Sequence, residues 1–165
     1  MKIHNHILTS AKWCPTVNYN ERPTADINML VVHNISLPPE QFGGSYIEDF
    51  FCNQLDCTAH PYFETIKDLQ VSAHLLIRRD GSVVQFVPFD KRAWHAGRSE
   101  FKGQTECNDF SIGIELEGSD HINYDKRQYE VLAQVTELLL QTYPAMIPER
   151  IVGHSDIAPG RKTDP

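Results

Sequence analysis

Short runs of apolar residues predict buried strands at two places in the first half of the chain. The run INMLVVHN at 27–34 is rich in β-forming residues and predicts a buried strand. Segments 74–78 and 82–87 flank Asp80 and Gly81, a dipeptide that favours a tight hairpin turn. We therefore expect an antiparallel hairpin over these two segments.

A strict alternation of apolar and polar residues marks the segment SIGIELEG at 111–118. Successive side chains of a strand point to opposite faces, so the apolar positions would share one face, which we expect in the core. The other face, which carries Glu115, is expected to be polar. The segment IVGH at 151–154 predicts a last short strand.

The clearest helical pattern runs from about 126 to 143, where apolar residues recur along one stripe. Asp125 is placed to cap this helix, and Gln128 stands three residues later, in the position of a capping box. Tyr124 and Tyr129 have the spacing of a hydrophobic staple. These signals together predict where the helix begins.

The remaining segments predict loops and one shorter helix. Residues 46–54 favour a short helix, whereas 36–45 contains two Pro and two Gly and predicts a loop. Residues 1–26 and 95–109 are mixed and polar, and we expect them to be irregular. Strands and helices are mixed along the chain, which predicts an α/β fold with a mixed sheet.

Composition and charge exclude several classes of protein. A chain of 165 residues that is 41% hydrophobic and 22% charged predicts one domain over 1–165. No apolar run approaches the ~20 residues of a membrane span, and a net charge of −7 argues against nucleic-acid binding. The start, MKIHNHILTSAKWCP, lacks the apolar stretch of a secretory signal. We therefore expect a cytoplasmic protein that binds neither nucleic acid nor membrane.

The four cysteines form no CxxC pair. In a chain without a secretory signal, reduced and partly buried thiols are the expected state. Cys52 and Cys57 are candidates for two ligands of a zinc site, but the sequence contains no second pair of ligands to complete it.

Two histidines and one aspartate are candidates for a metal site. His33 lies at the end of a predicted strand, where it is either a core histidine or a metal ligand beside a cleft. His154 follows another predicted strand, and Asp164 comes ten residues later. Two imidazoles and a carboxylate suit zinc and leave a fourth position for water, although their spacing is no local motif.

Three further residues have two interpretations each, an ordinary structural role and a role in catalysis or substrate binding. Glu115 is either a solvated strand glutamate or a general base close to a metal-bound water. Lys162 is either a surface lysine or a positive charge for a developing oxyanion. Trp94 is either part of the core or a platform on which a sugar ring stacks.

Five segments in order resemble one known family: LVVHNISLPP, SAHLLIRRDG, VQFVPFDKRAWHAG, CNDFSIGIELEG and GHSDIAPGRKTDP. They are similar to the bacterial cytosolic 1,6-anhydro-N-acetylmuramyl-L-alanine amidases of the AmpD type. These zinc amidases share a fold with the peptidoglycan recognition proteins. The resemblance covers about residues 13 to 165 and implies a central mixed β-sheet flanked by helices, with a zinc cleft on one face.

The resemblance also implies a cofactor and roles for particular residues. Zinc is the implied cofactor, and its implied ligands are His33, His154 and Asp164. Glu115 matches the catalytic glutamate of the family and Lys162 matches its lysine. The looser assignments for substrate binding are Trp94 and His95 on the sugar side and Asn34 on the peptide side.

The implied reaction is hydrolysis of the amide between the lactyl group of (1,6-anhydro-)N-acetylmuramic acid and L-Ala, in cell-wall recycling. The family thereby restrains β-lactamase induction indirectly. We expect a monomer whose partner is a small muropeptide. Two alternatives are a module that binds muropeptide without cutting it, against which the full ligand set argues, and an amidase of intact wall in the periplasm, against which the missing signal argues.

Overall fold

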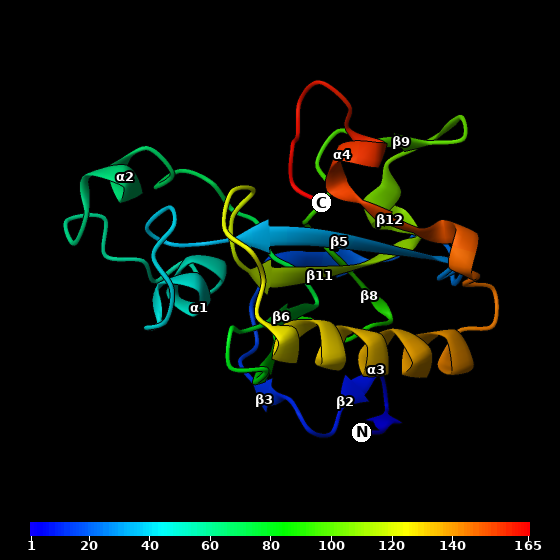
Figure 1. Cartoon of the computed structure of the whole chain (residues 1–165). Helices are drawn as coiled ribbons and strands as arrows, with labels where there is room; N and C mark the ends of the chain where they lie inside the picture. Colours follow the sequence, from blue (N-terminus) through cyan, green and yellow to red (C-terminus); the bar gives the residue numbers. More distant parts are fainter.

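A six-stranded sheet forms the centre of the computed structural model, which describes residues 1–165 (Figure 1). Its strands, in spatial order, are β12 (Ile151–Gly153), β5 (Met29–Ile35), β11 (Ser111–Glu117), β6 (Leu75–Ile77), β7 (Val83–Gln85) and β3 (Lys12–Trp13). The pair β6–β7 is antiparallel, whereas every other neighbouring pair in the sheet is parallel. The expected mixed sheet is therefore confirmed.

The predicted strands are confirmed, with small changes at their ends. Strand β5 begins at Met29, two residues inside the predicted run at 27–34, and extends to Ile35. Strands β6 and β7 form the expected hairpin, in which Leu75 is the register partner of Gln85. Gly81 adopts a φ of 82° in the connecting turn, a left-handed conformation that glycine adopts without steric cost.

Helix α3 (Lys126–Thr142) begins where the capping signals predicted. The Arg127 amide donates to Asp125 Oδ1 at 3.0 Å, and the Asp125 amide donates to Gln128 Oε1 at 3.0 Å. The rings of Tyr124 and Tyr129 lie edge to face, with centroids 6.0 Å apart, as the staple requires. The predicted short helix is α1 (Tyr46–Phe51).

Helix α3 covers one face of the sheet, and α4 (His154–Ile157) lies on the opposite side (Figure 1). Val135 and Leu139 of α3 belong to the apolar cluster that contains Ile112 and Ile114 of β11. A smaller cluster on the α4 side joins Ile157 to residues of β5 and to the segment before β11. No helix of the structure is both long enough and apolar enough to cross a membrane.

The two segments expected to be irregular contain short regular elements, so that expectation was wrong. The first 26 residues hold β1 (Ile3–His4), β2 (Ile7–Leu8), β3 and β4 (Tyr19–Glu21), and 95–109 holds β9 (Glu100–Phe101), β10 (Gln104–Thr105) and the 3₁₀ helix η1 (Cys107–Asp109). Strand β4 pairs with β8 (Lys91–Ala93), and α2 (Pro61–Glu64) and η2 (Pro148–Arg150) were not foreseen. Pairings of only two or three residues, whether local as in β1–β2 and β9–β10 or distant as in β4–β8, are too short to leave a periodic pattern in the sequence.

Strand β11 also differs from expectation, because both of its faces are buried. All seven of its residues are buried, including Ser111 and Glu115 on the face expected to be polar. Strands β5 and β6 pair with it on either side, so it lies inside the sheet. The face that carries Glu115 meets the turn that contains His95, whose ring lies directly over Gly113. This face is the floor of the candidate site.

Candidate metal centre and active site

Three neighbouring parallel strands place the principal candidates side by side at their carboxyl ends. His33 of β5 is the register partner of Glu115 of β11. On the other side of β5, Gly153 of β12 pairs with Val32, so His154 follows at the level of His33. Residues that are 121 positions apart in the sequence thus become neighbours because adjacent strands share one direction.

Asp164 completes a convergent group of donor atoms. Its Oδ2 lies 2.9 Å from Nδ1 of His154 and 3.3 Å from Nδ1 of His33. The three ligand atoms lie within 4.8 Å of one another. Both histidines are buried, with only 1% and 3% of their surfaces exposed, whereas Asp164 is half-buried at the edge.

Backbone and side-chain bonds hold Asp164 in place at the end of the chain. The amide of Ser155 in α4 donates to the carbonyl oxygen of Asp164 at 3.0 Å. The preceding hydroxyl, Thr163 Oγ1, donates to Oδ2 of Asp120 at 2.5 Å. The other carboxylate oxygen of Asp120 accepts from Nδ2 of Asn34 at 2.8 Å. Asp120 therefore links Thr163, which precedes Asp164, to Asn34, which follows His33.

The protonation states of this group suit a divalent metal. Burial lowers the pKa of His33 to about 4, although its contact with Asp164 acts in the opposite direction. Burial alone would raise the pKa of Asp164, but the hydrogen bonds and charges of His154 and His33 outweigh it and hold that pKa well below its usual range. At neutral pH the group offers a neutral His33 imidazole and an ionised carboxylate, which are donors that zinc accepts.

Glu115 is buried beside this group. It is only 8% exposed, and its Oε2 is buried without a hydrogen-bond partner in the protein. Burial, and to a smaller extent the negative charge of Asp164, raises the pKa of its carboxyl to about 8 against the opposing charge of Lys162. A buried carboxylate oxygen without a hydrogen-bond partner therefore lies beside three converging metal-ligand atoms. This arrangement fits a site that binds a metal ion and a water molecule.

Comparison with known proteins decides the family. Residues 23–165 match the family model described as N-acetylmuramoyl-L-alanine amidase. The 1,6-anhydro-N-acetylmuramyl-L-alanine amidase AmpD of Escherichia coli (strain K12) is 55% identical over 159 residues, which are 96% of this chain and 86% of that protein. The chain belongs to this amidase family.

Two solved structures extend the comparison. The crystal structure of a Se-Met AmpD derivative superposes with a TM-score of 0.97 at 54% identity, covering 100% of this chain and 92% of that one. The E. coli amidase AmiD, solved in complex with the substrate anhydro-N-acetylmuramic acid-L-Ala-D-γ-Glu-L-Lys, gives a TM-score of 0.58 at 32% identity. That match covers 84% of this chain and 52% of AmiD. The expected fold of the family is thereby confirmed.

A cleft of about 680 Å³ opens above the donor group of the amidase. This volume lies in the usual range of small-molecule sites, roughly 300–1,000 Å³. Lys162 and Asn34 both line the cleft, as do the metal-ligand candidates and Glu115. Apolar side chains, among them Phe50, Tyr62 and Leu69, form another part of its lining. The cleft thus combines polar, chemically competent residues with an apolar wall.

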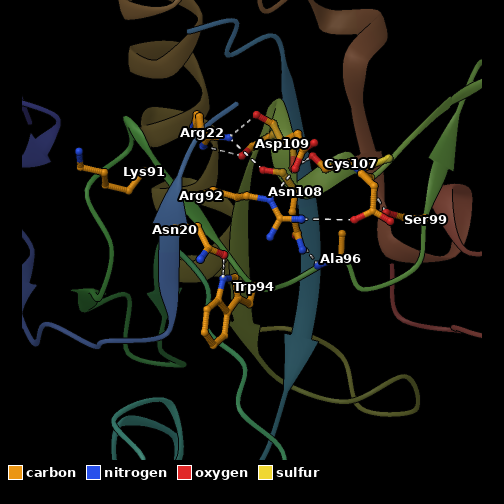
Figure 2. Close-up of polar contacts among 12 residues, drawn as sticks. Asn20, Arg22, Lys91, Arg92, Trp94, Ala96, Ser99, Cys107, Asn108 and Asp109 are labelled. Carbon is orange, nitrogen blue, oxygen red and sulfur yellow. Dashed lines mark hydrogen bonds and ion pairs between the residues drawn. The ribbon is translucent and has the colours of Figure 1, made fainter. Parts of the chain in front are cut away.

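Two residues expected on the sugar side occupy other positions. Trp94 does not line the cleft, and its indole Nε1 donates to Oδ1 of Asn20 at 2.6 Å (Figure 2). His95 borders the cleft but is buried, with Nδ1 2.9 Å from Nε2 of His33 and Nε2 3.2 Å from Oγ of Ser111. Both nitrogens of the His95 ring are occupied by protein groups, so neither is free to bind a sugar hydroxyl.

The amidase site also contains residues that the sequence did not single out. Asp120 follows β11 in a polar loop, and Asn108 lies in η1, where nothing in the local pattern distinguishes either from a surface residue. Gly113 offers a signal that could have been used. A glycine inside a strand often marks close approach of another group, and a Cβ here would lie 2.4 Å from Cγ of His95.

Proposed function

We propose that this amidase uses zinc, held by His33, His154 and Asp164, to hydrolyse the amide between the lactyl group of 1,6-anhydro-N-acetylmuramic acid and L-Ala. The observation that carries the proposal is the convergence of the three donor atoms within 4.8 Å beside a buried, unpartnered carboxylate. Three protein ligands leave a fourth zinc position for water, and the neighbouring carboxylate supplies a group that can take a proton from that water.

Bound zinc would supply an acidified water and a positive charge for the substrate carbonyl. Glu115 then acts as the general base, because it lies beside His33 in the sheet and its Oε2 has no protein hydrogen-bond partner, so it is available to take a proton from that water. The protonated Glu115 returns that proton to the departing amine of L-Ala. Lys162 lines the cleft and offers its ammonium to the carbonyl oxygen as negative charge develops.

Asn34 is the residue that we propose for the peptide side of the substrate. Its Nδ2 donates to Asp120 and to the hydroxyl of Tyr124, so the side chain is fixed in orientation. The opposite atom, Oδ1, makes no hydrogen bond within the protein, and the residue lines the cleft. A fixed carbonyl oxygen is suited to accept an amide N–H of the stem peptide.

The names of the relatives support the choice of substrate. The E. coli relative is named for 1,6-anhydro-N-acetylmuramyl-L-alanine, and AmiD was solved with an anhydro-muramyl tripeptide. We propose that the chain acts as a monomer on such small fragments in the cytoplasm, where it would serve cell-wall recycling. Removal of anhydro-muropeptides would indirectly restrain β-lactamase induction.

The test is an assay of purified, zinc-loaded enzyme on anhydro-muramyl-tripeptide and on intact sacculi, with release of the free peptide measured by mass spectrometry. We expect rapid release from the soluble fragment and little from the sacculi. In Glu115→Gln we expect turnover to fall about 10²–10⁴-fold, the usual contribution of a general base, with zinc content unchanged. Preference for sacculi would overturn the substrate proposal, and a fully active Glu115→Gln would overturn the assignment of the base.

A further inference from the structure

In both His33 and His154, one ring nitrogen points away from the proposed metal position. A protein group lies beside each of these nitrogens and fixes the orientation of the ring. Nε2 of His154 lies 3.1 Å from the carbonyl oxygen of Ala96, which can only accept, so Nε2 carries the proton. Nδ1 of His154 is thereby left with its lone pair toward Asp164. Nε2 of His33 lies 2.9 Å from Nδ1 of His95.

The bonds around His95 form a chain with a single direction. When Nδ1 of His33 serves as a ligand atom, Nε2 carries the proton and donates to His95 Nδ1. His95 Nε2 then carries its own proton and faces Ser111 Oγ at 3.2 Å. The Ser111 hydroxyl in turn donates to the carbonyl oxygen of Cys107 at 2.6 Å. Each donor in this chain has one acceptor, so the tautomers of both rings are determined.

The partner of His33 is His95 and the partner of His154 is Ala96. These two residues are consecutive and lie in one turn after β8. One side-chain atom holds that turn: Oδ1 of Asn108 accepts the amide of His95 at 3.2 Å and the amide of Ala96 at 2.8 Å (Figure 2). Asn108 is 5% exposed and lies in η1, the 3₁₀ helix that also ends the His95 chain at Cys107.

Arg22 holds Asn108 itself in position. Its guanidinium donates to the backbone oxygens of Asn108 at 3.0 Å and Asp109 at 3.1 Å, as well as to those of Phe89 and Ser111 (Figure 2). Arg22 therefore ties the carbonyls of η1 to Phe89, in the loop before β8, and to Ser111 of β11. Oδ1 of Asn108 is a rigid point against which the turn at 95–96 is set.

We propose that Asn108 is a positioning residue for the metal centre, because one side-chain oxygen places both groups that orient His33 and His154. The inference rests on the proposed function, since it assumes that these histidines bind metal. Groups that hydrogen-bond to metal-ligating histidines typically contribute about 10–100-fold to metal affinity. Loss of Asn108 Oδ1 would disturb two such groups at once.

The test compares zinc dissociation constants, measured by competition with a chelator, among variants of the full chain. Asn108→Leu removes the acceptor, and we expect zinc to bind about 10–100-fold more weakly. Asn108→Asp keeps an oxygen at the same place, and we expect affinity close to wild type. The matched control is Asp109→Asn, in the same 3₁₀ helix as Asn108. It removes the charge that forms the 2.5 Å ion pair with Arg92 of β8 and leaves the turn at 95–96 untouched. A purely structural role for η1 would weaken zinc binding in the control as well.

Two further measurements apply if Asn108→Leu does not fold. Gly113→Ala forces a methyl group against the His95 ring, and we expect it to weaken zinc binding through His33 alone. In the wild-type protein loaded with zinc, nitrogen-15 NMR should show a proton on Nε2 of His33, His95 and His154. Equal zinc affinity in wild type and Asn108→Leu, or a proton on Nδ1 of His95, would overturn the inference. A wild-type protein that binds no zinc would instead overturn the proposed function.

Discussion

Replacement of Glu115 by Gln should change how the stability of the metal-free protein depends on pH. Burial raises the pKa of Glu115 to about 8 in the folded chain, from 4.5. Between these two values the folded state binds a proton that the unfolded state releases. Stability contributed by the neutral carboxyl is therefore present at low pH and is lost as the pH rises from 4.5 toward 8.

The size of the effect follows from the linkage relation, in which one pKa unit corresponds to about 1.36 kcal/mol. From pH 5 to pH 8 the wild type should lose up to about 4 kcal/mol of unfolding free energy that Glu115→Gln retains. Comparing the two pH values within each protein cancels the pH-independent cost of burying the Gln amide. The assay is urea unfolding of both metal-free proteins at each pH. Parallel stability profiles for wild type and variant would refute the claim that Glu115 is buried in a site that disfavours its charge.

Three further predictions concern metal, core and thiols. His154→Ala should lose stoichiometric zinc by metal analysis, whereas His121→Ala, which alters a cleft residue outside the donor group, should keep it. Gln128→Ala should lower the free energy of unfolding by about 2–4 kcal/mol, measured by thermal unfolding. The buried Gln128 side chain donates to the carbonyls of Ile77 and Glu117 and accepts from the amide of Asp125, the cap of α3. As a control, Gln141→Ala at an exposed position of the same helix should leave the free energy of unfolding almost unchanged. Titration of the unfolded, unreduced protein should find all four thiols free, and a count of two or fewer would contradict a cytoplasmic protein.

The elements that the sequence predicted well are those with local signals. The hairpin at β6–β7 was recognisable from Asp80 and Gly81, and α3 from the cap at Asp125, since these residues act on backbone groups a few positions away. The two- and three-residue strands near the N-terminus could not be found this way. Strands β3 and β4 pair with β7 and β8, about 70 residues later in the chain, and the register of such pairs depends on the whole fold, whereas β1 and β2 pair with each other over only two residues.

The candidate site shows the same division between chemistry and placement. The residue types of His33, His154, Asp164 and Glu115 suggested a metal and a base, but their spacing could not show that parallel strands bring them together. The roles of His95 depended on a ring nitrogen 2.9 Å from His33, which no sequence pattern encodes. Strand β11 misled for a related reason: its polar face is covered by another segment, so alternation indicated a face without showing whether solvent reaches it.

The most direct test of the account is a crystal structure of the zinc-loaded protein with anomalous diffraction measured at the zinc absorption edge. The account predicts a single strong peak within about 2.0–2.2 Å of Nδ1 of His33, Nδ1 of His154 and a carboxylate oxygen of Asp164. Glu115 should lie beside this peak without being one of the zinc ligands. A peak at the cysteines or at the surface, or no peak in fully active enzyme, would contradict it.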